Sequence, residues 1–153
     1  MKKVLVLLLL VLSCSTENKQ KNNLEGENLK GNVKSVREFS YVAVDKFGEI
    51  IKGERKRENK SDNYTSYDDK GNKIEANLYK SDGSLVYKII YKYDDKDNKI
   101  ETNFYNKDDS LALKETNKYD DIGNVIEANI YKSDGILLYK TIYKYDDKGN
   151  VIE

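Results

Sequence analysis

Carboxylate side chains recur along this chain at a spacing that could bring them close together. Adjacent Asp pairs begin at positions 68, 94, 120 and 146, each 26 residues after the one before. Calcium needs six to eight oxygen ligands around one point. A segment of the type Asp-Asp-Lys-Gly-Asn offers fewer oxygens and carries a lysine charge. Turn formation by the Asp side chains is therefore favoured over calcium binding, and we expect no metal site.

A second carboxylate recurs at Glu75, Glu101 and Glu127. Carboxylate pairs can cleave glycosidic bonds at separations of about 5 Å or about 6.5–9.5 Å, and next-but-one strands of a sheet lie roughly 9–10 Å apart. Repetition argues against this activity, because one active site does not need a copy in every repeat. The chain also has no histidine, which is the commonest general base. We predict a protein that is not an enzyme, with no catalytic residues and no cofactor. The preferred partners of these carboxylates, in a cross-strand charge ladder, are Lys88, Lys114 and Lys140.

Tyrosine is the remaining residue type with binding potential, and the chain has 13 of them. Its ring is apolar and its tip is polar, which suits both a half-exposed sheet and contact with a sugar or a protein. Two roles for the tyrosines are therefore considered: they only pack on the sheet, or they form a row that faces a ligand. Leu113 and Asn117 interrupt the row in the middle repeat. The candidate ligand face consists of Tyr79, Tyr87, Tyr91, Tyr131, Tyr139 and Tyr143.

The elements that carry these side chains form an internal repeat. The phrase that begins Tyr-Asp-Asp opens at Tyr67, Tyr93, Tyr119 and Tyr145, so residues 67–153 are a repeat region with a period of 26 residues. A fixed period of this length indicates stacked structural units.

Each unit contains two turn signals, and the residues between them alternate with period two. In the first unit Leu85, Tyr87 and Ile89 fall on one side of an expected strand. The sequence therefore predicts an all-β fold: an antiparallel β-meander built from 26-residue two-strand repeats, as a twisted or curled open sheet of roughly ten strands. Asp97 and Asp109 replace turn glycines, which predicts more strained turns in the middle unit.

Residues 32–66 precede the repeats and lack their phrase. Two apolar-containing stretches, Val33–Asp45 and Glu49–Glu58, flank the turn signal Lys46-Phe47-Gly48. We expect an irregular hairpin that caps the end of the array, because repeat arrays usually need an atypical terminal unit.

The N-terminus has the layout of an export signal. Lys2 and Lys3 precede the apolar run Val4–Leu12, which is too short to cross a bilayer as a helix. Residues 1–13 are therefore expected to be a signal peptide. The segment Val11-Leu12-Ser13-Cys14 resembles the bacterial lipobox, which implies that Cys14 becomes the first residue and carries the lipid that attaches the protein to a membrane. Ser15 follows, where Asp would be expected to signal inner-membrane retention, and this implies the outer membrane.

Residues 14–31 are polar and aperiodic, and we expect a lipidated flexible tether, with a short helix near residues 23–29 as the alternative. The whole chain has 27 basic and 27 acidic residues. This balance argues against a nucleic-acid partner, which would need a net basic face.

The phrase Tyr-Asp-x-x-Gly-Asn resembles the YD (Rhs) repeat of bacterial surface and toxin proteins. Its residues here are Tyr67, Asp68, Gly71 and Asn72, with copies at 119 and 145. The resemblance implies a curved β-sheet, exposure in the cell envelope and possible carbohydrate binding. A Lys- and Glu-rich composition behind a lipid anchor is also similar to that of spirochaete surface lipoproteins with a single-layer sheet.

These observations favour a membrane-anchored, non-catalytic binding lipoprotein of the cell envelope, facing either the periplasm or the cell surface. Its partner would be a glycan or a protein. The alternatives are a structural or envelope-assembly protein facing the periplasm, and an immunity partner of a secreted toxin.

Overall fold

The computed structural model describes residues 23–55 and 62–152. Cys14 and the expected signal peptide lie outside this part of the chain. The described elements are one short helix and ten strands: α1 (Asn23–Gly26), β1 (Ser35–Glu38), β2 (Tyr41–Lys46), β3 (Glu49–Arg55), β4 (Asp62–Tyr67), β5 (Lys73–Tyr79), β6 (Leu85–Tyr93), β7 (Lys99–Asn106), β8 (Leu111–Tyr119), β9 (Val125–Lys132) and β10 (Leu137–Ile142).

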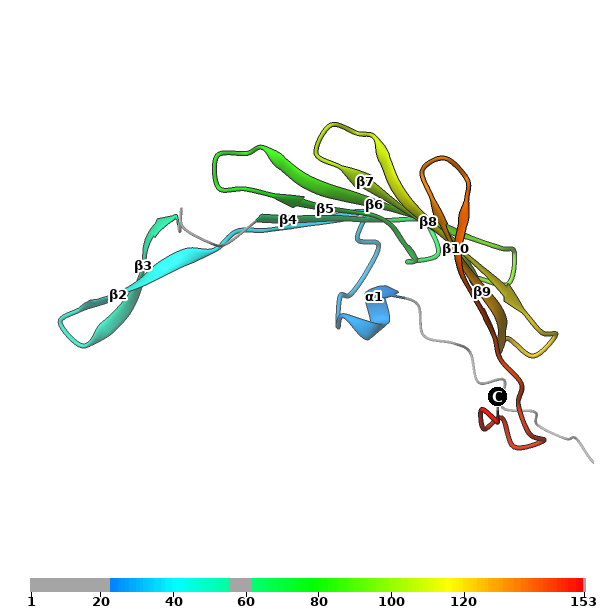
Figure 1. The fold of residues 1–153 in the computed structure, drawn as a ribbon. Coiled ribbons are helices and arrows are strands. Elements are labelled where there is room, and N and C mark those ends of the chain that lie inside the picture. The colour runs from blue at the N-terminus through cyan, green and yellow to red at the C-terminus, as the bar shows by residue number, and fades with distance from the viewer. Residues whose placement is uncertain (1–22, 56–61, 153) are drawn as a thin grey trace, which may run out of the picture.

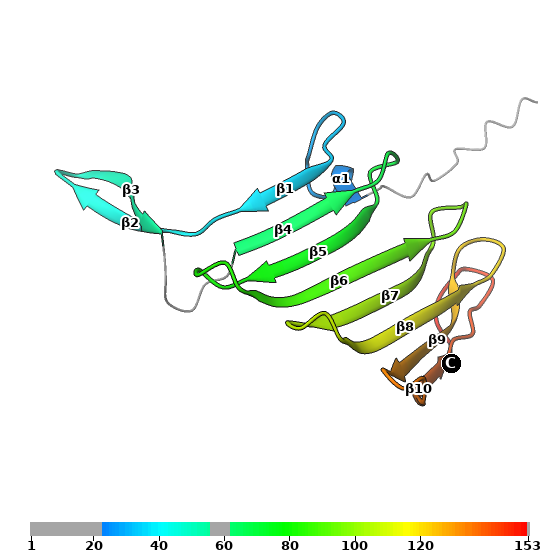
Figure 2. The ribbon, with the colours of Figure 1, turned by 90° about the horizontal axis from the view of Figure 1, so that it is seen from above.

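The strands form one large open sheet and one separate hairpin. The large sheet has eight strands in the order β1-β4-β5-β6-β7-β8-β9-β10, and β2 pairs only with β3. All pairings are antiparallel. From β4 onwards each strand lies beside its neighbour in sequence, and the sheet arches over α1 (Figure 1, Figure 2). The prediction of an all-β antiparallel meander that curls as an open sheet is confirmed.

The turn that opens each repeat has the same hydrogen bonds in all four copies. In the first copy the Asp68 amide donates to the Asn72 carbonyl at 2.9 Å, and the Asn72 amide donates to Asp68 Oδ1 at 2.8 Å. The second of these bonds is 2.8 Å in every other copy as well. The Asp pairs therefore form turns, as the sequence predicts, and the structure adds that the first Asp of each pair makes the hydrogen bonds.

The middle unit places Asp where the other units place Gly. Asp97 has φ of 66° and Asp109 of 61°, whereas Gly71 has 87° at the equivalent position of the first unit. Side chains rarely adopt this left-handed region without a penalty. Asp97 and Asp109 thus keep the positive φ that glycine supplies in the other units, and the strain expected from this stays a prediction.

The two faces of the large sheet differ in composition. The inner face, on which α1 lies, carries a row of cross-strand partners that are mostly apolar: Ala76, Ile89, Phe104 and Leu113. The outer face carries rows of charged and amide side chains, of which Glu101 and Asn103 are examples. No second sheet covers either face among the described residues, and only Leu24 and Tyr67 form a buried apolar core there.

The N-terminal part of the fold differs from the expected cap. The stretch Val33–Asp45 is not one strand, because β1 leaves the hairpin and pairs with β4 of the large sheet. This pairing gives the backbone groups along one edge of β4 their partners, which a detached hairpin could not do. The β2–β3 hairpin projects from the large sheet instead of closing it (Figure 2).

Residues 23–31, which the sequence assigns to the flexible tether, belong to the folded domain. Leu24 is only 7% exposed, and its amide donates to the Gly71 carbonyl at 3.2 Å. The cap is therefore α1 together with β1. The short helix, the less favoured alternative, is what the structure contains.

Candidate functional site

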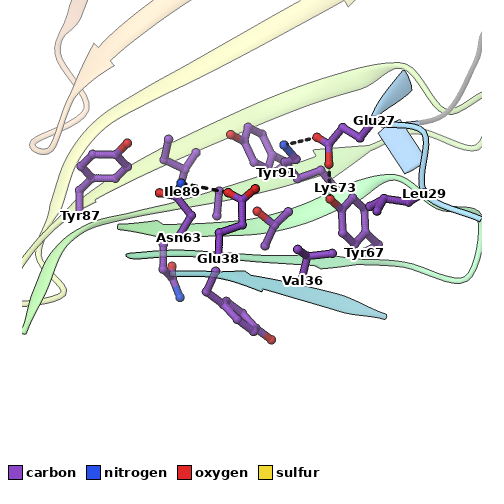
Figure 3. A pocket seen from close by; sticks show the side chains of 14 residues that line it. Glu27, Leu29, Val36, Glu38, Asn63, Tyr67, Lys73, Tyr87, Ile89 and Tyr91 are labelled. Carbon is purple, nitrogen blue, oxygen red and sulfur yellow. Dashed lines mark hydrogen bonds and ion pairs between the residues drawn. The ribbon is translucent and has the colours of Figure 1, made fainter. Parts of the chain in front are cut away.

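A pocket of about 570 Å³ opens on the inner face beside α1 (Figure 3). It lies at the N-terminal end of the sheet, where α1, β1, β4, β5 and β6 meet. Pockets of about 300–1,000 Å³ are typical of small-molecule sites. The labelled side chains around it are Glu27, Leu29, Val36, Glu38, Asn63, Tyr67, Lys73, Tyr87, Ile89 and Tyr91.

The end of the pocket nearest α1 is a cluster of three polar side chains. Glu27 forms an ion pair with Lys73, with 2.7 Å between Oε1 and Nζ, and accepts a hydrogen bond from the Tyr67 hydroxyl. Tyr67 is only 3% exposed. The Glu27 carboxylate thus contacts both the Lys73 ammonium and the Tyr67 hydroxyl at the pocket wall.

The electrostatics of this cluster keep Glu27 ionised. Partial burial opposes its charge, but hydrogen bonds from Lys73 and Tyr67 and the charge of Lys73 outweigh burial, so its pKa lies below the usual value. Burial, followed by the contact with Glu27, raises the pKa of Tyr67. Near neutral pH the cluster contains an ionised acid, a charged lysine and a protonated phenol, which together carry no net charge.

The repeat explains why Tyr67 needs Glu27. The tyrosines that open the later units each donate to a backbone carbonyl 20 residues earlier, at 2.8 Å: Tyr93 to Lys73, Tyr119 to Lys99 and Tyr145 to Val125. Tyr67 opens the first unit, so no earlier repeat strand offers it that carbonyl. The Glu27 carboxylate takes its place.

Aromatic and amide groups form the rest of the wall. Tyr87, Ile89 and Tyr91 come from alternate positions of β6 and therefore share the inner face. At the far side, Asn63 Nδ2 donates to Glu38 Oε2 at 3.1 Å. Aromatic rings beside fixed hydrogen-bonding groups suit the recognition of a polar ring.

The six predicted ligand-face tyrosines do not share a face. Tyr87, Tyr91, Tyr139 and Tyr143 lie on the inner face, whereas Tyr79 and Tyr131 lie on the outer face, so a single face with all six is wrong. Tyr79 follows the alternation of β5, and its hydroxyl accepts a hydrogen bond from outer-face Asn77 at 3.0 Å. The reason is that side chains alternate along a strand.

The four inner-face tyrosines form two separate groups. Tyr87 and Tyr91 of β6 line the pocket, whereas Tyr139 lies on β10, four strands further along the sheet, and Tyr143 lies just beyond the end of β10. Leu113 and Asn117 of β8 lie between the groups, as the sequence predicts. Tyr139 is 68% exposed.

Sequence reasoning missed the polar half of the pocket, namely Glu27, Glu38, Asn63, Tyr67 and Lys73. The one signal that could have indicated it is the position of Tyr67 as the first repeat tyrosine, which lacks the acceptor available to the later ones.

The repeated glutamates form the predicted charge ladder on the outer face. Glu101 lies between Lys92 and Lys114, at 2.7 Å from each. Glu127 is held in the same way, by Lys118 at 3.0 Å and Lys140 at 2.9 Å.

Lys88 departs from the prediction because it pairs with Asp109, while Glu75 accepts from Asn77 Nδ2 at 2.6 Å. Asp109 comes within reach because it replaces a turn glycine.

Within residues 23–55 and 62–152 no group of three metal-ligating side chains comes together. The same part of the chain contains no helix that is long and apolar enough to cross a membrane. Comparison with protein-family models and with curated proteins finds no match for this chain.

Proposed function

We propose that this chain is a lipid-anchored, non-catalytic binding protein of the bacterial cell envelope that holds a glycan in the pocket beside α1. The resemblance of residues 11–14 to a lipobox supports the anchor at Cys14, and Ser15 favours the outer membrane. The resemblance to YD repeats supports exposure in the envelope.

The observation that carries the binding proposal is the pairing of aromatic and hydrogen-bonding groups in one pocket. Tyr87 and Tyr91 offer ring surface to the C–H face of a sugar, and Glu38 and Asn63 offer polar atoms to its hydroxyl groups. The Glu27–Lys73 pair is neutral as a unit and Glu38 adds a further carboxylate to the wall, which disfavours an anionic ligand.

A matched pair of double variants tests the binding site. Tyr87→Ala with Tyr91→Ala should abolish binding on a glycan array, because both rings line the pocket. Tyr79→Ala with Tyr131→Ala removes two tyrosines from the outer face and should leave binding intact. Equal loss in both variants, or unchanged binding in the first, would contradict the site. Circular dichroism of all variants checks that the sheet persists.

Two experiments test the anchor and the orientation. Cys14→Ala should prevent lipid labelling and release the protein from membranes, and continued labelling would refute the anchor. Protease treatment of intact cells, with a periplasmic protein as control, then separates surface exposure from a periplasmic location. Binding only to an envelope protein in crosslinking, with no glycan hit, would favour the envelope-assembly alternative.

A further inference from the structure

The β2–β3 hairpin exposes apolar side chains that do not line the pocket. Every residue of β2 is exposed, and so are Phe47 at 100% and Ile50 at 68%. The hairpin projects away from the large sheet (Figure 1, Figure 2). A two-stranded hairpin alone in water is marginally stable. Its exposed apolar groups therefore call for a surface that covers them.

The tip presents its aromatic residue in an unfavourable backbone conformation. Phe47 has φ of 59° and Gly48 of 87°, and the Gly48 amide donates to Asp45 Oδ1 at 2.8 Å. A two-residue turn of this kind prefers Asn or Asp before Gly. A phenylalanine there costs conformational energy and exposes a whole ring, so its presence points to contact made by the tip itself.

The rest of the hairpin continues the apolar surface behind the tip. Val44 and Ile51 are cross-strand partners on one face. On the other face the Lys52 ammonium lies 3.6 Å from the centre of the Tyr41 ring, so its stem covers apolar surface while its charge stays at the edge. Apolar groups lie at the end, and charged groups of both signs, among them Lys46, Glu49 and Lys52, lie beside them. An apolar tip can enter a lipid interface while the charges behind it stay in water.

Charge and chain length both favour a bilayer as the partner. Residues 41–55 contain three acidic and three basic side chains, so the hairpin has no net charge with which to select a charged protein. Cys14 precedes Asn23 by about nine residues, which span at most roughly 30 Å. A lipid on Cys14 would hold the domain within that distance of the membrane.

We infer that the tip of the β2–β3 hairpin, led by Phe47, inserts into the interfacial region of the membrane that holds the anchor. This inference rests on the proposed lipid at Cys14. A fluid bilayer accepts a single protruding ring without a matching cavity. A stable protein interface would need about 800 Å² on each partner with a complementary surface. The hairpin thereby gives the anchored domain a second attachment point and fixes its tilt.

The chain has no tryptophan, so one substitution creates a site-specific fluorescent probe. Phe47→Trp reports on the tip, and Ile122→Trp is the matched control, because Ile122 is 84% exposed in a turn of the large sheet. Both lipidated proteins are reconstituted into phosphatidylcholine–phosphatidylethanolamine vesicles with brominated acyl chains. We expect F47W emission to shift to shorter wavelength and to be quenched by bromine, with no change for I122W. Equal behaviour of the two probes would overturn the inference.

Two further arms separate the other outcomes. A blue shift of F47W that depends on protein concentration without vesicles would mean that a second copy covers the tip, and would also overturn the inference. Lipid labelling of Cys14 tests the anchor separately. If labelling fails, unlipidated F47W added to the same vesicles decides insertion by itself. Phe47→Asn suits the turn and keeps the hairpin, and in the lipidated protein it should reduce the protection of the hairpin from protease by vesicles; unchanged protection would count against insertion.

Discussion

The hydroxyl of Tyr93 donates a hydrogen bond to the backbone carbonyl of Lys73, 2.8 Å away and 20 residues earlier. The tyrosine that opens one unit thus fastens that unit to the first strand of the unit before. Burial raises the pKa of Tyr93 to about 12, so the phenol stays protonated and can donate at any physiological pH.

Removing one such tyrosine hydroxyl should lower the free energy of unfolding. We expect Tyr119→Phe to lower the free energy of unfolding by about 1 kcal/mol, the usual net value of a hydrogen bond. The Lys99 carbonyl then loses its 2.8 Å hydrogen bond from Tyr119 and keeps only the longer one from Asn117 Nδ2, at 3.3 Å. Tyr139→Phe is the control, since Tyr139 is largely exposed. Urea denaturation of both variants provides the measurement, and equal effects would refute a fastening role.

At position 97, in a turn of the middle unit, the effect of backbone conformation on stability can be separated from that of the side chain. Asp97→Gly and Asp97→Ala both remove the carboxylate that pairs with Lys70, so their difference reports on the backbone alone. We expect the Gly variant to be more stable by about 1 kcal/mol, because the residue has φ of 66°. Asp95 in the same turn has no positive φ, and there Gly should give no advantage over Ala. Thermal unfolding of the four variants measures the difference in stability between Gly and Ala at each position.

Acid should weaken the sheet through the glutamate ladder. Hydrogen bonds from Lys114, Lys92 and Asn103 lower the pKa of Glu101 to about 2, whereas in the unfolded chain a glutamate has a pKa of about 4.3. A lowered folded-state pKa means that the stabilisation is complete above the unfolded value and is lost as the pH falls from about 5 to about 2.

Glu101→Gln should therefore flatten the dependence of unfolding free energy on pH between about 5 and about 2. Urea titrations at several pH values measure this dependence. Glu54→Gln is the control, because Glu54 is exposed on the separate hairpin. Parallel profiles for wild type and Glu101→Gln would show that the ladder does not stabilise the fold.

Opening the cap should expose the first repeat. We expect Leu24→Ala to cost about 2 kcal/mol, the lower end for a buried leucine, because Leu24 is one of two buried apolar residues in the described chain. Hydrogen exchange should quicken in β1 and β4 and stay unchanged in β9. Ile122→Ala, a change at an exposed turn, should leave all of these rates unaltered, and uniform acceleration by Leu24→Ala would contradict a local cap.

The structure of the repeat region was predictable because each of its features depends on residues that lie close together in the sequence. Period-two alternation predicts the strands, and the Asp pair followed by Gly71 and Asn72 predicts the turn, in which the structure shows Asp68 bonded to Asn72. The Glu127 ladder followed from spacing alone. Asp109 replaces a turn glycine and adds a carboxylate, which pairs with Lys88 in place of the repeated glutamate. The repeat pattern could not predict this pair, because it treats all units as identical.

The cap and the pocket were not predictable in the same way. They depend on α1 docking against β5, about 50 residues later in the chain, where the Lys73 amide donates to Asn23 Oδ1 at 2.8 Å. No periodic signal marks a contact of this range. The split of the tyrosines between two faces was accessible from alternation, but only once β5 and β6 were paired in register through Leu78 and Tyr87.

Because each strand of the large sheet contacts only its neighbours, the sheet can open from either end without disturbing its middle. The pocket lies at one of those ends and joins α1, β1 and the first three strands of the meander. A ligand there would stabilise that end of the sheet against opening. Binding would slow exchange in β1, β4 and β5, while β10 would keep its own rate of opening.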